Sequence, residues 1–153
     1  MLILENKIPP LFVALVFCIL MWWISSLSAP IELSFIFRIV LSSVIIMTGL
    51  FFCAAGIICF KRANTTVNPL QPEAASSLVS SGIYRFSRNP MYVGFALFLV
   101  SFSIYLSSPH SILGVAGFIL YMNKFQIEPE ERALEEIFGS AFSHYKSNVR
   151  RWL

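Results

Sequence analysis

The chain has 153 residues, of which 57% are hydrophobic and only 12% are charged, and its net charge is +3. A soluble globular domain carries a charge on about a quarter of its residues, so this composition indicates a single-domain membrane protein. The charge is small and no basic patch is interleaved with aromatic residues, which excludes a nucleic-acid partner.

Four apolar segments predict an all-α fold, a polytopic membrane bundle of four transmembrane helices. They cover about residues 10–27, 35–60, 91–107 and 111–127. The uncharged stretch Ile39–Phe60 would extend about 33 Å at ~1.5 Å per residue, enough to cross a hydrocarbon core of about 30 Å. Ser108 and Pro109 are typical of a helix start, so the last two segments should form a tight hairpin.

The first segment has a second interpretation, a cleaved signal peptide. Its apolar part is longer than the usual signal sequence, however, and no A-x-A cleavage site follows it. Trp22 and Trp23 fit an aromatic belt at the membrane surface better. Segments 10–27 and 35–60 carry no motif, and the sequence alone suggests that any hydrophobic pair could replace them.

Basic residues gather on one side of this predicted bundle. That side receives Lys7, Lys61, Arg62, Arg85, Arg88, Lys124, Arg132, Lys146, Arg150 and Arg151, and the other receives only Arg38. Because positive charges concentrate on the cytoplasmic side, we expect a multi-pass protein of the inner or cytoplasmic membrane with both termini cytoplasmic. The loop 61–90, called the motif loop below, and the tail 128–153 then share that side.

The cysteines give no reason to expect a metal. Cys18, Cys53 and Cys59 fall inside apolar segments, where a cysteine behaves as a small hydrophobic residue. Their spacing fits no zinc pattern, and His110 and His144 are predicted to lie on opposite faces of the membrane.

The motif loop ends in a polar island, SGIYRFSRNPMYVG, where it leads into the third segment. Gly82 permits a turn, Asn89 is biased away from helix by the following proline, and Pro90 suits a first helical turn. The free N–H groups of that helix start would lie beside Arg88, an arrangement that attracts a carboxylate or phosphate. Arg88 is therefore a candidate catalytic residue; the alternative is an arginine that anchors the helix at the membrane surface.

The tail begins with a second polar island, EPEERALEEIFG. Its apolar residues recur at helical spacing and predict one amphipathic helix along the membrane; they are Leu134, Phe138, Ala141 and Tyr145. Its glutamates crowd together, which costs stability unless a ligand offsets the repulsion. The functional interpretation is that one glutamate binds a polar cofactor, and the alternative is an acidic helix start favoured by the helix dipole.

Together the two islands resemble the isoprenylcysteine carboxyl methyltransferase family and its relatives among membrane phospholipid methyltransferases. The matching positions are Leu78-Val79, Gly82-Ile83-Tyr84, Arg88-Asn89-Pro90-Met91-Tyr92, Glu130-Glu131, Phe138-Gly139, Tyr145 and Val149-Arg150-Arg151. They cover roughly the second half of the chain, in the family's order.

This resemblance implies an enzyme that uses S-adenosylmethionine without a Rossmann domain, in a pocket between the motif loop and the tail. The residues implied to line that pocket are Ser76, Leu78, Val79, Tyr84, Asn89, Pro90, Tyr92 and Glu130, with Glu131 close by. Methyl transfer from a sulfonium needs alignment more than acid–base help, so positioning can supply most of the acceleration. Glu130 and Arg88 would offer partners for the cation and the carboxylate of the cofactor.

Three positions depart from the family pattern. Asn89 replaces the usual histidine and cannot carry a proton at neutral pH, and Phe142 stands where a tyrosine is common. Gln126 occupies the place of an arginine that lies on the substrate side in the prenylcysteine enzymes. Gln126 is thus the expected substrate-binding residue, and an amphiphilic acceptor that is neutral or carries an amine is preferred to a prenylcysteine carboxylate.

Two other functions remain open at this stage. The same region resembles membrane sterol reductases that use NADPH, although those carry asparagine at the position of Met91. A non-catalytic membrane scaffold is the other alternative. The acceptor is also open, because a lipid amine, a lipid carboxylate, a thiol and a small hydrophobic metabolite all fit.

Overall fold

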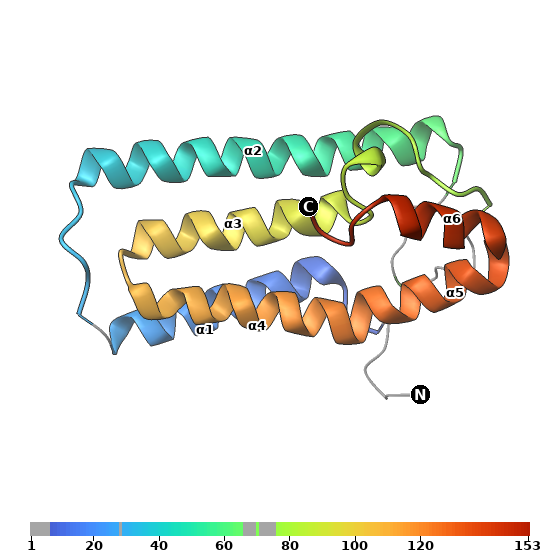
Figure 1. Cartoon of the computed structure of the whole chain (residues 1–153). Coiled ribbons are helices and arrows are strands. Elements are labelled where there is room, and N and C mark those ends of the chain that lie inside the picture. Colours follow the sequence, from blue (N-terminus) through green and yellow to red (C-terminus); the bar gives the residue numbers. More distant parts are fainter. Residues whose placement is uncertain (1–6, 28, 66–69, 71–75) are drawn as a thin grey trace.

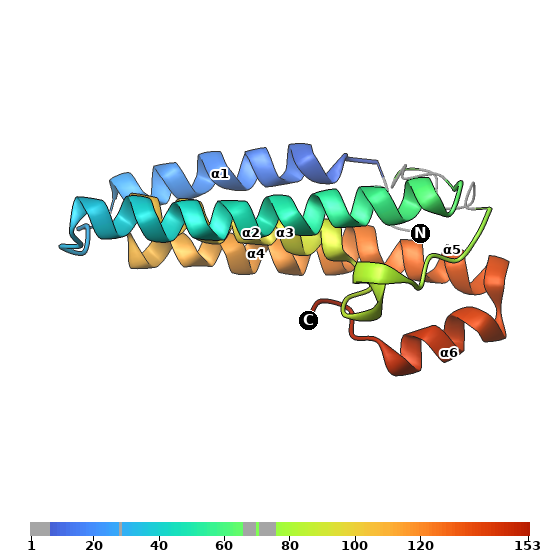
Figure 2. The same ribbon diagram turned by 90° about the horizontal axis from the view of Figure 1, so that it is seen from above.

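The computed structural model describes residues 7–27, 29–65, 70 and 76–153, and every regular element in these ranges is helical, which confirms the all-α prediction. The bundle contains α1 (Pro10–Ser26), α2 (Phe35–Arg62), α3 (Pro90–Leu106) and α4 (Ile112–Met122). Figure 1 shows α2, α3 and α4 as one layer, and Figure 2 shows α1 packed to one side of it. The motif loop, the tail and the start of α1 lie at the same end of the bundle (Figure 1).

Of the helices in the described part of the chain, only α2 is both long and apolar enough to cross a membrane by itself. It has 28 residues and a mean hydropathy of 2.4, and only 11% of its most apolar stretch is buried inside the protein. The apolar helices α1 and α3 are shorter, with 17 residues each. Large apolar side chains cover the outside of α1 and α2, a surface suited to lipid contact.

Helices α2 and α3 approach each other closely through small residues. A Cβ atom added at Gly94 would lie 2.8 Å from the backbone oxygen of Gly49. Nearer the other end, Ser42 Oγ donates to the carbonyl of Ser101 at 3.1 Å, and Ser101 Oγ donates to the carbonyl of Ser42 at 2.9 Å. The expectation that any hydrophobic helix could replace the second segment is therefore wrong, since a bulkier helix would not fit against α3.

The first segment also packs specifically. Met21 of α1 is fully buried beside Gly114 of α4, where a Cβ atom would collide with the methionine side chain. Phe17 meets the ring of Phe118 edge-on, with ring centroids 6.1 Å apart. Together with Leu99 of α3, these side chains form the main apolar core of the bundle.

The fourth predicted segment continues into the tail as one helical rod. The 3₁₀ turn η3 (Pro109–Ser111) leads into α4, which confirms the helix start expected at Pro109. A π-helical turn, η4 (Asn123–Ile127), then joins α4 to α5 (Glu128–Phe138). Pro129 has no N–H to donate to the preceding turn, and the wider π turn accommodates this loss without a sharp kink.

The tail contains two helices, so the prediction of a single amphipathic helix is wrong. Gly139, with φ of +50°, ends α5, and α6 (Ser140–Asn148) folds back toward the motif loop (Figures 1 and 2). Positive φ favours glycine, so the break is encoded at that residue. Leu134, Phe138 and Tyr145 of the predicted apolar face do pack together, but against the motif loop.

Candidate functional site

The motif loop folds locally as its glycine and proline predict. Gly82 has φ of +61° and opens the short 3₁₀ helix η2 (Gly82–Arg85). Asn89 has φ of −129° and ψ of +55°, outside the helical region, and α3 begins at Pro90. The sequence before α3 therefore turns sharply, which brings Arg88 and Asn89 to the surface that receives the tail. Residues 66–69 and 71–75 of the predicted loop lie outside the described residues.

The end of the tail bonds directly to this turn. The backbone N–H of Arg88 donates to the carbonyl of Arg150 at 2.9 Å, and Asn89 Nδ2 donates to the carbonyl of Arg151 at 2.9 Å. The guanidinium of Arg88 also donates to the carbonyls of Lys146, at 3.1 Å, and Val149. These bonds join the first polar island to the end of the tail, about sixty positions further along the sequence, as the family resemblance implied.

Glu131 lies between two arginines. Its Oε1 is 2.7 Å from Nη2 of Arg88, and its Oε2 is 2.7 Å from Nη2 of Arg151. Burial by itself raises the pKa of Glu131, but the hydrogen bonds from Arg151 and Arg88 outweigh it and lower the net pKa below its ordinary value. Glu131 is therefore ionised and holds both arginines in place.

Glu130 has different partners. Its Oε1 accepts a hydrogen bond from the hydroxyl of Tyr92 at 2.6 Å and another from Nε2 of Gln126 at 2.6 Å. Burial raises the pKa of Glu130 to about 7, although both donors act to lower it. The pKa of Glu130 is thus raised above the ordinary value for a glutamate, and that of Glu131 is lowered below it. Shifted pKa values are common at functional sites.

Tyr84 forms the third part of the site. Its side chain is 5% exposed and meets the ring of Phe60 edge-on, and its backbone carbonyl accepts a hydrogen bond from the hydroxyl of Tyr145 at 2.7 Å. Burial raises the pKa of Tyr84, so its hydroxyl stays protonated, and no described residue bonds to that hydroxyl. Gly56 of α2 lies beside this hydroxyl, since a Cβ atom there would be in ordinary contact with the oxygen at 3.6 Å.

The remaining predicted pocket residues border this group. Leu78 and Val79 pack with Tyr84 and Tyr145 in the apolar cluster beneath α6. Ser76 lies further out, at the end of α2, where its backbone N–H donates to Thr65 Oγ1 at 3.0 Å. Tyr92 and Gln126 therefore lie with Glu130, and Arg88 lies with Glu131, while Ser76 stays at the margin.

Some residues of this region were not singled out from the sequence. Trp152 Nε1 donates to Asn123 Oδ1 at 2.9 Å, which fixes the end of the tail to the π turn. Arg151 binds Glu131, and Gly56 faces Tyr84 and Pro90. The family pattern contains the position of Arg151 but not its partner, and no local signal marks Trp152, Asn123 or Gly56.

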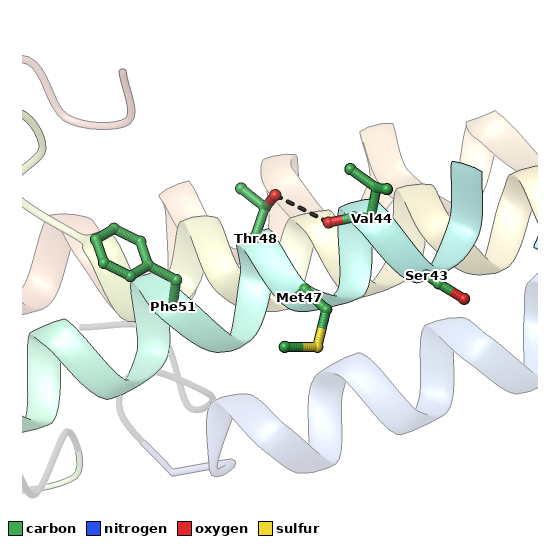
Figure 3. Close-up of a pocket in the computed structure, with 5 residues that line it drawn as sticks. All are labelled: Ser43, Val44, Met47, Thr48 and Phe51. Carbon is green, nitrogen blue, oxygen red and sulfur yellow. Dashed lines mark hydrogen bonds between the residues drawn. The ribbon is translucent and has the colours of Figure 1, made fainter. Parts of the chain in front are cut away.

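A shallow pocket elsewhere does not belong to this site. It has a volume of about 500 Å³ and is lined by Ser43, Val44, Met47, Thr48 and Phe51 (Figure 3). All five residues belong to α2, and none of them contacts the glutamates of α5. Among the described residues, no three His, Cys, Asp or Glu side chains lie close enough to hold a metal ion.

Comparisons with known proteins point to one family. Residues 37–141 match the model of the phospholipid methyltransferase family. Protein-S-isoprenylcysteine O-methyltransferase A of Arabidopsis thaliana is 27% identical over 128 residues, which cover 84% of this chain and 58% of that protein. The corresponding enzyme of Dictyostelium discoideum is 36% identical over 72 residues, 47% of this chain and 30% of that protein.

An uncharacterized protein of Haemophilus influenzae is 44% identical over 63 residues, which cover 41% of this chain and the whole of that protein. No solved structure matches the chain. The chain thus spans little more than half of the Arabidopsis methyltransferase and less of the Dictyostelium one. Because the family match covers well over half of the chain, the chain belongs to the phospholipid methyltransferase family of S-adenosylmethionine-dependent membrane enzymes.

Proposed function

We propose that this protein is an integral membrane methyltransferase that uses S-adenosylmethionine to methylate an amphiphilic or lipid-like acceptor at the cytoplasmic membrane face. The main support is the contact between Tyr92 and Glu130, whose side chains meet at 2.6 Å. This hydrogen bond joins the start of the apolar helix α3 to helix α5 of the polar tail. A ligand site beside it would therefore border both lipid and water. Such a border suits a water-soluble cofactor and a membrane-dissolved acceptor.

The cofactor residues proposed here fit a ligand with a positive charge. Glu130 offers a carboxylate, and its Oε2 receives no hydrogen bond from a described residue. Tyr84 supplies a hydroxyl to which no described residue bonds, and Asn89 and Pro90 shape the adjoining backbone. S-adenosylmethionine would supply an electrophilic methyl group on a sulfonium, and the protein would supply orientation and exclusion of water.

Arg88 and Glu131 have a positioning role in this proposal. Arg88 donates to Glu131 and to tail carbonyls, so it holds the tail against the motif loop. Its Nε is buried without a partner among the described residues, which leaves one donor available beside Glu131. A carboxylate of the cofactor could accept from that donor.

The membrane topology belongs to the same proposal. Helices α1, α2, α3 and the rod of α4 and η4 would each cross the bilayer, with the motif loop and the tail in the cytoplasm. The arrangement in Figure 1 supports this, because both polar segments emerge at one end of the bundle and Arg38 lies toward the other. Labelling of a single cysteine at position 110 tests it; access to that cysteine only from the cytoplasmic side would contradict the topology.

Binding of S-adenosylmethionine to the purified protein in lipid nanodiscs tests the function. Glu130→Ala should weaken binding roughly tenfold to a hundredfold, the loss expected for a charge-assisted hydrogen bond of about 1.5–3 kcal/mol. Glu136→Ala removes the same charge from an exposed position of α5 and should change little. Equal effects of the two variants would contradict a cofactor contact and would indicate that Glu130 only stabilises the start of α5.

The acceptor can be sought with a labelled methyl group. Membranes with and without the protein are supplied with S-adenosylmethionine carrying the label, and the extracted lipids are compared by mass spectrometry. We expect a labelled amphiphile only where the protein is present. A labelled product that also persists with Glu130→Ala at full yield would contradict the proposed site.

A further inference from the structure

Gln126 is a buried residue next to Glu130. Its side chain belongs to the π turn η4 and is 2% exposed. Its Nε2 lies 2.6 Å from Oε1 of Glu130, one helical turn further along the rod. The amide is therefore directed at the glutamate. Single π turns inside α-helices are frequent at functional sites.

Two donors from separate elements converge on the same carboxylate oxygen. Tyr92 approaches Oε1 of Glu130 from α3, and Gln126 approaches it from η4, each at 2.6 Å. No described residue donates to Oε2, and the Glu130 side chain is not fully enclosed. Because one oxygen is held from two directions, the carboxylate cannot rotate freely, and Oε2 is the atom that a ligand can reach.

We propose that Gln126 is a positioning residue: with Tyr92 it fixes Oε1 of Glu130, so that Oε2 is presented to the cationic part of a bound ligand. This inference rests on the proposed function, because S-adenosylmethionine carries a sulfonium and an ammonium. Gln126 then acts on the cofactor through Glu130 and makes no direct contact with the acceptor.

The charge of Glu130 provides a way to test this role. The titratable groups that face it are Tyr92 from α3, Tyr84 from η2 and Glu131 from α5, and the nearby arginines bind Glu131. Burial raises the pKa of Glu130 to about 7, and the hydrogen bond from Gln126 opposes that rise. Loss of the Gln126 donor should raise the pKa further, because the carboxylate loses a group that stabilises its charged form.

The experiment measures S-adenosylmethionine affinity of the full chain in nanodiscs by calorimetry from pH 5.5 to 8.5. In the unmodified protein, affinity should fall as the pH drops through the pKa of Glu130, because the neutral acid attracts a cation poorly. Gln126→Met keeps the side-chain volume and removes the donor. It should weaken binding about tenfold at pH 7 and move the midpoint of the pH profile upward. Lys124→Met, an exposed change in the same turn, is the matched control and should leave the midpoint in place.

A double-mutant cycle separates a positioning role from direct contact. In the Glu130→Gln background, Gln126→Met should have almost no further effect on cofactor affinity, since the residue it serves is gone. If Gln126 instead contacts the acceptor, Gln126→Met will change the KM for the acceptor and leave cofactor binding and its pH midpoint unchanged, which would overturn the inference. Full additivity of the two variants would overturn it as well.

The pH dependence of the Tm, measured without ligand, distinguishes a shifted pKa of Glu130 from a general folding defect of Gln126→Met. The pH at which Glu130 ionisation lowers the Tm should shift upward in Gln126→Met relative to the unmodified protein, and an unchanged pH dependence would contradict the positioning role. If the unmodified protein binds no S-adenosylmethionine at any pH, both the proposed function and this inference fail. Normal binding with an unshifted Gln126→Met profile overturns the inference alone.

Discussion

The hydroxyl of Tyr145 donates a hydrogen bond to the backbone carbonyl of Tyr84 at 2.7 Å, so the last helix of the tail is bonded to η2, near the end of the motif loop. The bond is buried, and it holds the turn from which Tyr84 extends toward Gly56. Two segments that a linear sequence keeps far apart are thereby fixed as one unit.

Tyr145→Phe should remove the hydrogen bond between α6 and η2 while keeping the apolar contacts of the ring. The carbonyl of Tyr84 would lose its partner in a buried place, at a cost of about 1–3 kcal/mol in the free energy of unfolding. We expect a lower Tm and weaker cofactor binding, measured by thermal unfolding and calorimetry. Tyr105→Phe removes an exposed hydroxyl from α3 and serves as the control. Equal Tm values for both variants would show that the bond contributes little.

Glu130→Gln should stabilise the ligand-free protein at alkaline pH. The pKa of Glu130 is about 7 in the folded protein, against an ordinary value of 4.5. The folded state therefore binds the proton more tightly than the unfolded state does, and this stabilisation is fully present below about pH 4.5 and is lost as the pH rises through about 7. A glutamine cannot ionise, so Tm at pH 8 should rise by about 2–4 °C for each kcal/mol recovered. Glu136→Gln is the exposed control. A Tm that falls at pH 8 for Glu130→Gln would contradict the raised pKa.

Glu131→Gln should destabilise the protein far more than Glu128→Gln, although both residues lie on α5. Glu131 neutralises the nearly buried Arg88, and loss of one partner of a buried ion pair costs about 3–5 kcal/mol. The loss is smaller for Arg151, because its side chain is 31% exposed and water can solvate its charge. Glu128 makes only an exposed contact with Lys124 at 3.5 Å, worth about 0–1 kcal/mol. Chemical unfolding of both variants gives the comparison, and equal losses would refute the bracing role of Glu131.

Gly94→Ala should cost more stability than Gly114→Ala. At Gly94 the new methyl group would meet the backbone oxygen of Gly49, which can move only with the helix, so α2 and α3 must separate. Overpacking of this kind costs about 1–3 kcal/mol. At Gly114 the nearest atoms to the methyl group belong to the side chain of Met21, which can change its rotamer without moving a helix. Thermal unfolding in nanodiscs should rank the variants in this order, and the reverse order would contradict close packing of α2 on α3.

A prenylated cysteine carboxylate should be a weak acceptor. Gln126 supplies no cation and is occupied by Glu130, and a buried carboxylate without a cationic partner is costly. We expect slower methylation of a farnesylcysteine analogue than of an amine-bearing amphiphile of similar length, measured by transfer of a labelled methyl group. Faster turnover of the carboxylate would indicate that an arginine of the tail provides the cation, and Arg150→Gln would then identify it.

The sequence predicted those features that arise from neighbouring residues. Apolar runs gave the positions of α1, α2 and α3, and Gly82 and Pro90 gave the turn before α3, because each acts on its own backbone. The choice of partners across space was not predictable in this way. Nothing local distinguishes Glu130, which meets Tyr92, from Glu131, which meets two arginines.

The break at Gly139 shows the same limit in the tail. Leu134, Phe138 and Tyr145 fit one continuous apolar face, and glycine alone does not reveal that the backbone takes positive φ there. Leu134, Phe138 and Tyr145 do pack together, whereas Ala141 is exposed, and the partner of these residues is the motif loop because α6 folds back. Gln126 was placed on the substrate side by analogy, which stays a prediction, and its hydrogen bond to Glu130 was not predictable because it depends on the π turn.

The helix that runs without a break from α4 through η4 into α5 fixes the distance between Glu130 and the opposite end of the bundle. From Ile112 to Glu130 it extends about 27 Å at ~1.5 Å per residue, close to the thickness of a hydrocarbon core. In the proposed topology, the number of residues in this helix therefore sets the height of the Glu130 carboxylate above the lipid tails. Under the proposed function, an acceptor would have to present its reactive atom at that level, so the depth of its head group in the bilayer would matter as much as its chemistry.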